Sequence, residues 1–193
     1  LSLGPNINAA MDPKVEPRAV EAVQKATARL SQATARERAY VEALAARYSA
    51  KKSVTRKAKD DAYAKAMRQV ARDAPDDAAT IAAEAMMVLR PWDYWRADGR
   101  PQPGTEEILA ILEAALRQHP DHPGACHYYI HAVEASPDPQ RALDCAKRLP
   151  SLMPGAGHLV HMPAHIYMRL GRYREASERN ATAAMVDHEY LSR

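Results

Sequence analysis

Two groups of histidines in the second half of the sequence have a spacing that suits metal binding. In the first group, His127 and His131 are four residues apart, and Glu134 follows His131 by three. Residues three or four apart share one face of an α-helix, so these three side chains are predicted to form one stripe. Imidazole nitrogens are common metal ligands, and a carboxylate can act as a further ligand or as a base. Such a stripe could hold an ion and activate a water molecule on it.

The second group repeats the first after 34 residues. His161 and His165 follow His127 and His131 at that interval, and His158 precedes His161 by three residues. Packed helices lie about 8–10 Å apart, so imidazoles from two neighbouring helices can converge on one ion at about 2.0–2.1 Å. We therefore predict a metal site formed by all five histidines.

The ligand types favour zinc, copper or nickel over iron. Imidazole suits all of these metals, and Met168, three residues after His165, would add a soft ligand. Di-iron sites in helical proteins need several carboxylates, whereas Glu134 is the only acid in the two stripes. Glu84, on an earlier helix, is a weaker candidate. If the metal is catalytic, Glu134 is the candidate general base.

Hydrophobic periodicity predicts helices through most of the chain. Runs of alternating β-branched residues, which would predict a sheet, are missing from the sequence. Alanine is prominent among the hydrophobic residues, which make up 47% of the chain, and small side chains suit close contacts between helices. Thr34 and Glu37 have the types and spacing of a capping box. The predicted helices cover residues 18–32, 34–48, 54–71, 77–89, 105–118, 122–135, 139–149, 157–170 and 172–188.

Two interruptions of this pattern bear on the histidines. Residues 90–104 contain proline, glycine and three aromatic side chains within four positions, and they are predicted to form an ordered insertion because such aromatics need a surface to pack on. Pro163 falls inside the predicted helix 157–170 and removes one backbone hydrogen bond. We expect that helix either to kink at Leu159 or to begin near Met162, with His158 in the preceding loop.

An internal repeat of 34 residues constrains the fold. Pro120 and Pro154 close successive units, and Asn180 takes a position where a large apolar residue is usual. With Gly157 as the first position of a unit, small and aromatic residues fall at Ala164, Tyr167, Gly171, Tyr173, Ala176 and Ala183. On these residues the chain resembles the tetratricopeptide repeat family from Thr105 to the C-terminus, and more weakly over 18–89. The run from His158 to His165, together with Pro91–Trp95, is similar to a bacterial group of such proteins.

The resemblance implies an all-α fold, a right-handed α-solenoid of antiparallel helix pairs. It also implies that the first helix of each pair lines a concave groove and that positions 2, 5, 9 and 12 of the unit face it. His158 holds position 2, the two histidine pairs hold positions 5 and 9, and Glu134 and Met168 hold position 12. The implied function is a scaffold that binds a protein or peptide partner in this groove, beside the metal.

Three other functions remain open from the sequence. The chain could be a metalloenzyme in which three or four histidines hold the ion and Glu134 is the base. It could be a metal-free groove in which the histidines donate hydrogen bonds to a peptide. The histidines could also serve polar packing alone.

Composition and motifs argue against several classes of protein. The net charge is only +3, and the basic stretch 51–59 is followed at once by two aspartates, so no nucleic acid partner is expected. The sequence has no run of about 18 apolar residues, so no membrane span is predicted. There is no glycine-rich phosphate loop, no CxxC pair and no recognisable catalytic triad order. His119 and His122 lie in a predicted turn and are expected to form a solvated connector.

The two cysteines and the chain ends bear on the cellular setting and on the extent of the protein. Cys126 and Cys145 lie in predicted helices, which suggests a reduced, cytoplasmic setting, and Cys126 is expected to be buried and inert. All residues, 1–193, are assigned to one helical domain. Residues 1–4 resemble a helix end with its glycine cap, so the chain is expected to be a fragment of a longer protein that could have carried a targeting segment. The uncapped ends of such a stack could pair two copies in a homodimer.

Overall fold

The structure is a computed structural model that describes residues 3–50, 53–73 and 76–192. Within these ranges every regular element is a helix, so the predicted all-α fold class is confirmed. None of the helices in the described ranges is long and apolar enough to cross a lipid bilayer. The expected helix end at residues 1–4 and the basic stretch 51–59 lie partly outside the described residues.

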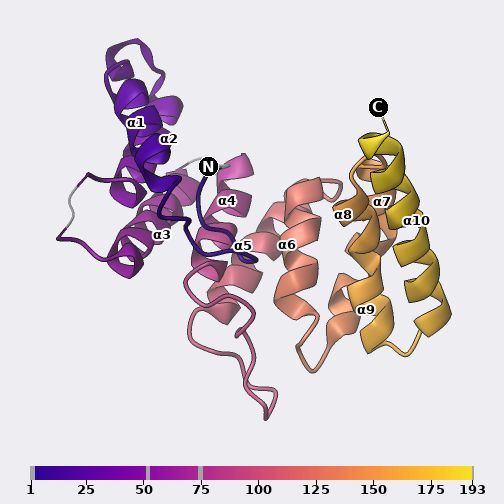
Figure 1. Cartoon of the computed structure of the whole chain (residues 1–193). Coiled ribbons are helices and arrows are strands. Elements are labelled where there is room, and N and C mark those ends of the chain that lie inside the picture. Colours follow the sequence, from indigo (N-terminus) through magenta and orange to yellow (C-terminus); the bar gives the residue numbers. More distant parts are fainter. Residues whose placement is uncertain (1–2, 51–52, 74–75, 193) are drawn as a thin grey trace. The chain divides into compact units, whose positions relative to one another are not determined.

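The chain divides into two compact units, Leu1–Trp92 and Asp93–Arg193. In the first unit, coloured indigo to magenta in Figure 1, each α-helix packs against the next α-helix along the chain. Its helices are α1 (Glu16–Thr27), the short 3₁₀ helix η1 (Leu30–Gln32), α2 (Ala35–Arg47), α3 (Arg56–Asp73) and α4 (Asp76–Met87).

Small side chains and one capping box shape the first unit. The Thr34 hydroxyl accepts a hydrogen bond from the Glu37 backbone N–H, and the Glu37 carboxylate accepts one from the Thr34 N–H, so the predicted capping box at the start of α2 is confirmed. Alanines fill most of the buried face of α4, which allows α3 and α4 to lie close together; the buried alanines are Ala78, Ala79, Ala82, Ala83 and Ala85.

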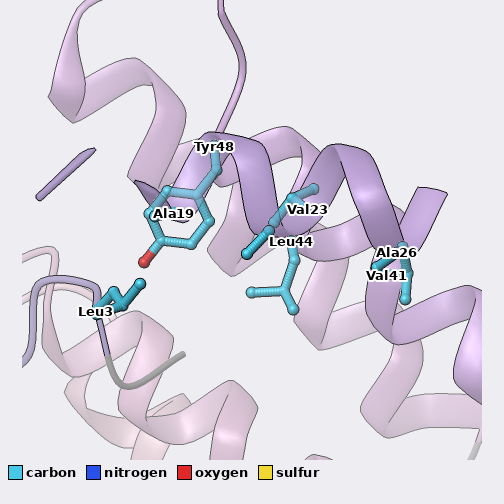
Figure 2. Close-up of a pocket in the computed structure, with 8 residues that line it drawn as sticks. Leu3, Ala19, Val23, Ala26, Val41, Leu44 and Tyr48 are labelled. Atoms are coloured by element: carbon cyan, nitrogen blue, oxygen red, sulfur yellow. The ribbon is translucent and has the colours of Figure 1, made fainter. Parts of the chain in front are cut away.

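A shallow apolar pocket lies between α1 and α2. Figure 2 shows Tyr48 at one end of it and Val41 with Ala26 at the other. Its remaining lining is aliphatic and comes from Leu3, Ala19, Ala22, Val23 and Leu44. No charged side chain lines this pocket, so it offers shape and apolar surface but no group that could do chemistry.

The second unit carries the histidines. In Figure 1 it runs from the pink α5 to the yellow α10. Helix α6 packs against α5, α7 and α9, while α10 packs against α8 and α9. The helices are α5 (Thr105–Gln118), α6 (Pro123–Val133), the 3₁₀ helix η2 (Pro139–Ala142), α7 (Leu143–Leu152), α8 (Gly157–His161), α9 (Pro163–Arg169) and α10 (Tyr173–Leu191).

Pro163 divides one predicted helix into two. Helix α8 ends at His161 and α9 begins at Pro163, so the interruption lies at Met162 rather than at Leu159. Met162 keeps helical backbone angles, with φ −48° and ψ −37°, and its N–H still donates to the His158 carbonyl. His158 is therefore helical and does not lie in a preceding loop. The proline costs one hydrogen bond but leaves the chain direction nearly continuous.

The part of the insertion that belongs to the second unit is folded against α6. Tyr94 is buried, and its carbonyl accepts hydrogen bonds from the Gln102 N–H and from the Thr105 hydroxyl. The indole N–H of Trp95 donates to the Ala132 carbonyl over 2.7 Å. Ala132 is near the end of α6, where helix carbonyls have no partner within the helix. Trp95 therefore caps the helix that carries His131.

Candidate metal centre

All five predicted histidines lie together in the second unit, on three helices. Helix α6 carries His127 and His131, α8 carries His158 and His161, and α9 carries His165. Their rings form a connected series: His131 lies 4.9 Å from His127 and 5.2 Å from His165 between ring centroids. His158 and His161 join the series from α8, at 5.0 Å from His127 and 4.7 Å from His165 respectively. The sequence spacing had predicted this convergence.

Three of these histidines form a compact set of nitrogen atoms. One ring nitrogen from each of His127, His131 and His158 lies within 4.8 Å of the other two. The Nε2 atoms of His127 and His158 are 3.0 Å apart. Two nitrogens bound to one tetrahedral ion at about 2.0–2.1 Å would be roughly 3.3 Å apart. If the two rings moved slightly apart, an ion would fit between their nitrogens. His131 would then be the third ligand.

Glu134 connects two of the histidines. It caps the C-terminus of α6 and is mostly buried. Its Oε1 accepts a hydrogen bond from Nδ1 of His131 over 3.0 Å, and its Oε2 accepts one from Nδ1 of His165 over 2.7 Å. Burial opposes ionisation, but the hydrogen bonds from the two histidines outweigh it and bring the pKa of Glu134 down to about 2. The side chain is a carboxylate at neutral pH, with both oxygens engaged.

The hydrogen bonds to Glu134 determine which ring nitrogen carries the proton. A carboxylate only accepts, so Nδ1 of His131 and of His165 must each carry hydrogen. In a neutral imidazole the lone pair is then on Nε2, the nitrogen that binds a metal in this tautomer. Around metal ions in proteins, a carboxylate commonly accepts in this way from a histidine whose other nitrogen binds the metal.

A second pair of histidine nitrogens lies close together on the other side of His165. The Nε2 atoms of His161 and His165 are 2.9 Å apart. Nδ1 of His161 is 2.7 Å from Oδ1 of Asn180 on α10, an oxygen that accepts a hydrogen bond. In the neutral form of both rings the two Nε2 lone pairs face each other. A proton or a metal cation between them would remove the repulsion of those lone pairs.

Burial keeps the three-nitrogen set uncharged. It lowers the pKa of His127 to about 3, with a smaller contribution from the neighbouring histidines. The pKa values of His131 and His158 are lowered as well, again first by burial. Neutral imidazole is the form that binds metals, so these residues are in the binding form at neutral pH. His158 is the exposed member, which opens the set to solvent.

The other candidates from the sequence are not among the residues that form these two groups of nitrogens. Met168 is 53% exposed. Glu84 belongs to α4 in the first unit. His122 has a local role, since its Nδ1 accepts a hydrogen bond from the Ala125 N–H and caps α6. Cys126 is fully buried, as predicted.

Asn180 is the residue that sequence reasoning missed. It contacts His161 from α10, a helix with no predicted ligand. The signal was present, because the repeat usually has a large apolar residue at this position, and an amide there can hydrogen-bond a polar side chain of a neighbouring helix.

Comparisons with known proteins bear on the fold. No protein family profile matches the chain, and no curated protein matches it significantly. A solved structure titled MamA MSR-1 C2, of a tetratricopeptide-repeat-containing protein, superposes with a TM-score of 0.57 over 90% of this chain and 95% of that one. The sequence identity is 16%. The fold is of the tetratricopeptide type. At this identity the likeness establishes the fold alone.

Proposed function

We propose that this chain is a helical-repeat scaffold that binds a transition metal ion through His127, His131 and His158 and presents it to a protein or peptide partner. One observation carries the proposal: ring nitrogens of His127, His131 and His158 lie within 4.8 Å of one another, and Glu134 holds His131, as well as His165, in the tautomer whose lone pair is on Nε2. Polar packing alone does not require three imidazole nitrogens to be gathered within 4.8 Å of one another.

The ligand set favours zinc, copper or nickel. All three metals accept neutral imidazole, and thiolate ligands are absent from the set. Three protein nitrogens leave at least one coordination position open. Since His158 is exposed, that position would face solvent, where a side chain or a terminal group of a partner could occupy it. This feature links the metal to the partner-binding role.

His161 and His165 are proposed as a second cation site next to the first. Asn180 and Glu134 orient the two rings in the same way that Glu134 orients His131. The two Nε2 atoms are 2.9 Å apart and could both bind one cation, with water molecules as the remaining ligands. Two ligands bind less tightly than three, so we expect this site to fill second.

The decisive experiment is a titration of the metal-free chain with Co²⁺ and Zn²⁺. Calorimetry gives the stoichiometry and affinity, while visible absorption of Co²⁺ reports coordination number and nitrogen ligands. We expect a tight first site that is lost in a His127→Ala, His158→Ala double variant. A weaker second site should be lost when His161 and His165 are replaced by alanine.

His188→Ala and His119→Ala are the matched controls, because both histidines are exposed and outside the cluster. If the double variants and the controls bind Co²⁺ with the same affinity and stoichiometry as the wild type, the metal proposal is wrong. Circular dichroism of each variant establishes that a loss of binding is not a loss of fold.

A metalloenzyme is the second candidate, and the three-nitrogen set favours it because catalytic zinc sites commonly have three protein ligands and a bound water. In such an enzyme the metal would lower the pKa of a water molecule bound to it. We assign Glu134 the role of orienting the histidines and not the role of general base. Both its oxygens already accept hydrogen bonds, and a carboxylate of pKa about 2 is a weak base. Hydrolysis of activated esters by the Zn²⁺-loaded chain, compared with the His127→Ala, His158→Ala variant, tests this candidate.

A further inference from the structure

A second group of potentially reactive side chains lies where α6 meets α7. Cys126 of α6 and Cys145 of α7 are both free thiols and both buried, at 0% and 5% exposure. Their Sγ atoms are 2.6 Å apart. The proposed metal function makes no use of either residue.

The distance between the sulfur atoms decides what the pair can do. Carbon atoms in contact are about 3.5–4.0 Å apart, whereas a disulfide bond is about 2.05 Å long. The Cys126 thiol donates a hydrogen bond to Cys145, and at 2.6 Å the two sulfur atoms are nearer to bonding distance than to such a contact. The two helices pack directly against each other, so their backbones already bring both side chains together.

One of the two thiols can be reached from outside. Cys145 contributes to the lining of a surface pocket together with Pro120, Tyr129 and Arg148. Cys126 does not line this pocket, but its Sγ is in contact with that of Cys145. A small oxidant can therefore reach the pair through this pocket.

We infer that Cys126 and Cys145 form a redox-active dithiol, which a hydroperoxide converts to a disulfide that links α6 to α7. In the first step one of the two sulfurs attacks one oxygen of hydrogen peroxide, the O–O bond breaks, and a sulfenic acid and one water form. In the second step the other sulfur attacks the sulfenic acid sulfur, the S–O bond breaks, and a second water leaves with the remaining thiol proton. Two thiols lose two electrons, which one peroxide accepts. A small thiol reverses the reaction by exchange.

The test uses the full chain, reduced, with a chelator present to suppress metal-catalysed oxidation. After treatment with about one equivalent of hydrogen peroxide, the chain is denatured and treated with N-ethylmaleimide, and its mass is measured. We expect a mass lower by about 2 Da than that of the reduced chain, with no maleimide adduct. A tryptic peptide should link residues 118–141 to 142–147. Dithiothreitol should restore two adducts.

Cys126→Ser and Cys145→Ser are the controls, and neither variant should form an intramolecular disulfide. Cys145→Ala serves if the serine variant is unfolded by circular dichroism. The chain contains only these two cysteines, so any other disulfide must join two molecules and would depend on protein concentration. Retention of both maleimide adducts, oxidation of Cys145 to sulfinic acid without a link, or intermolecular disulfides alone would overturn the inference.

Discussion

At the scale of single residues, Glu134 is the side chain on which the site depends most. It is one negative charge that accepts from two histidines on two helices, His131 of α6 and His165 of α9. The charge compensates the burial of the imidazoles and fixes their tautomers at the same time. Orientation of a ring before binding reduces the ordering that a metal must impose, which is why such supporting carboxylates affect metal affinity.

Replacement of Glu134 by glutamine should weaken metal binding without removing a ligand. The amide has one acceptor and one donor group, so it can no longer accept from both histidines. One imidazole must change tautomer or turn away. We expect Zn²⁺ affinity to fall about 10–100-fold, measured by competition with a chromophoric chelator. Glu178→Gln, on the exposed surface of α10, is the control; equal affinities in both variants would contradict the orienting role of Glu134.

A second residue-scale prediction concerns Glu84 in the first unit. Burial raises its pKa to about 7, and Arg47 only partly offsets this. The unfolded chain loses this proton near pH 4.5, whereas the folded chain keeps it up to about pH 7. Between these values the folded state binds more protons, so the free energy of unfolding should fall as the pH rises from 4.5 to 7.

Glu84→Gln should abolish that dependence. The free energy of unfolding of the variant, minus that of the wild type, should rise by on the order of 3 kcal/mol from pH 4.5 to pH 8. Urea denaturation at each pH measures both free energies. Glu42→Gln, an exposed residue of α2, is the matched control. A constant difference between Glu84→Gln and wild type across this range would show that Glu84 ionises normally.

At the scale of elements, the positions of α6, α8 and α9 decide whether the histidines meet. Pro163 shortens the hydrogen-bonded ladder between α8 and α9 but keeps the backbone helical at Met162, so His161 and His165 remain one turn apart. At the end of α6, Trp95 donates to the Ala132 carbonyl, between His131 and Glu134 in the sequence. The insertion therefore supports the helix end from which two site residues project.

Trp95→Phe tests this support. The variant keeps an aromatic ring but removes the indole N–H, which leaves the Ala132 carbonyl without that donor. We expect a loss of about 1–2 kcal/mol in the free energy of unfolding and a weaker metal site, measured by urea denaturation and Zn²⁺ titration. Trp92→Phe, at a residue that is 47% exposed, should change neither quantity by a comparable amount. Similar losses in both variants would assign the effect to general aromatic packing.

At the scale of the whole molecule, the two compact units divide the roles. The proposed ligands all belong to Asp93–Arg193, while Leu1–Trp92 has an alanine-rich core and the apolar pocket of Figure 2. A ligand that binds only the folded form stabilises the part of the chain that holds it.

Hydrogen exchange of the whole chain should show this division. With Zn²⁺ in excess, amides of α6, α8 and α9 should exchange about 10–100-fold more slowly, because their opening now requires release of the metal. Amides of α1 to α4 should exchange at unchanged rates. Mass spectrometry of peptic peptides gives both results in one experiment. Uniform protection across both units, or none in α6, would contradict a metal site confined to the second unit.

The sequence by itself determined the helical fold, the capping box at Thr34 and the grouping of the five histidines, because each depends on local spacing. Intervals of four residues place side chains on one face, and a 34-residue repeat brings equivalent faces together. The insertion and the break at Pro163 were also predicted from proline, glycine and aromatic positions. Of the two alternatives for the break, a helix that begins near Met162 is the one found, although His158 is helical and not in a loop.

Only the tertiary structure decided which atoms meet. The hydrogen bonds from His131 and His165 to Glu134, the contact of His161 with Asn180 and the approach of Cys126 to Cys145 all join different helices or depend on how a side chain is directed by its neighbours. Sequence spacing specifies a face of a helix but not the rotation and distance of the helix packed against it. Those are set by close packing of the core, and they determine proton positions, ligand geometry and the reach of one thiol to another.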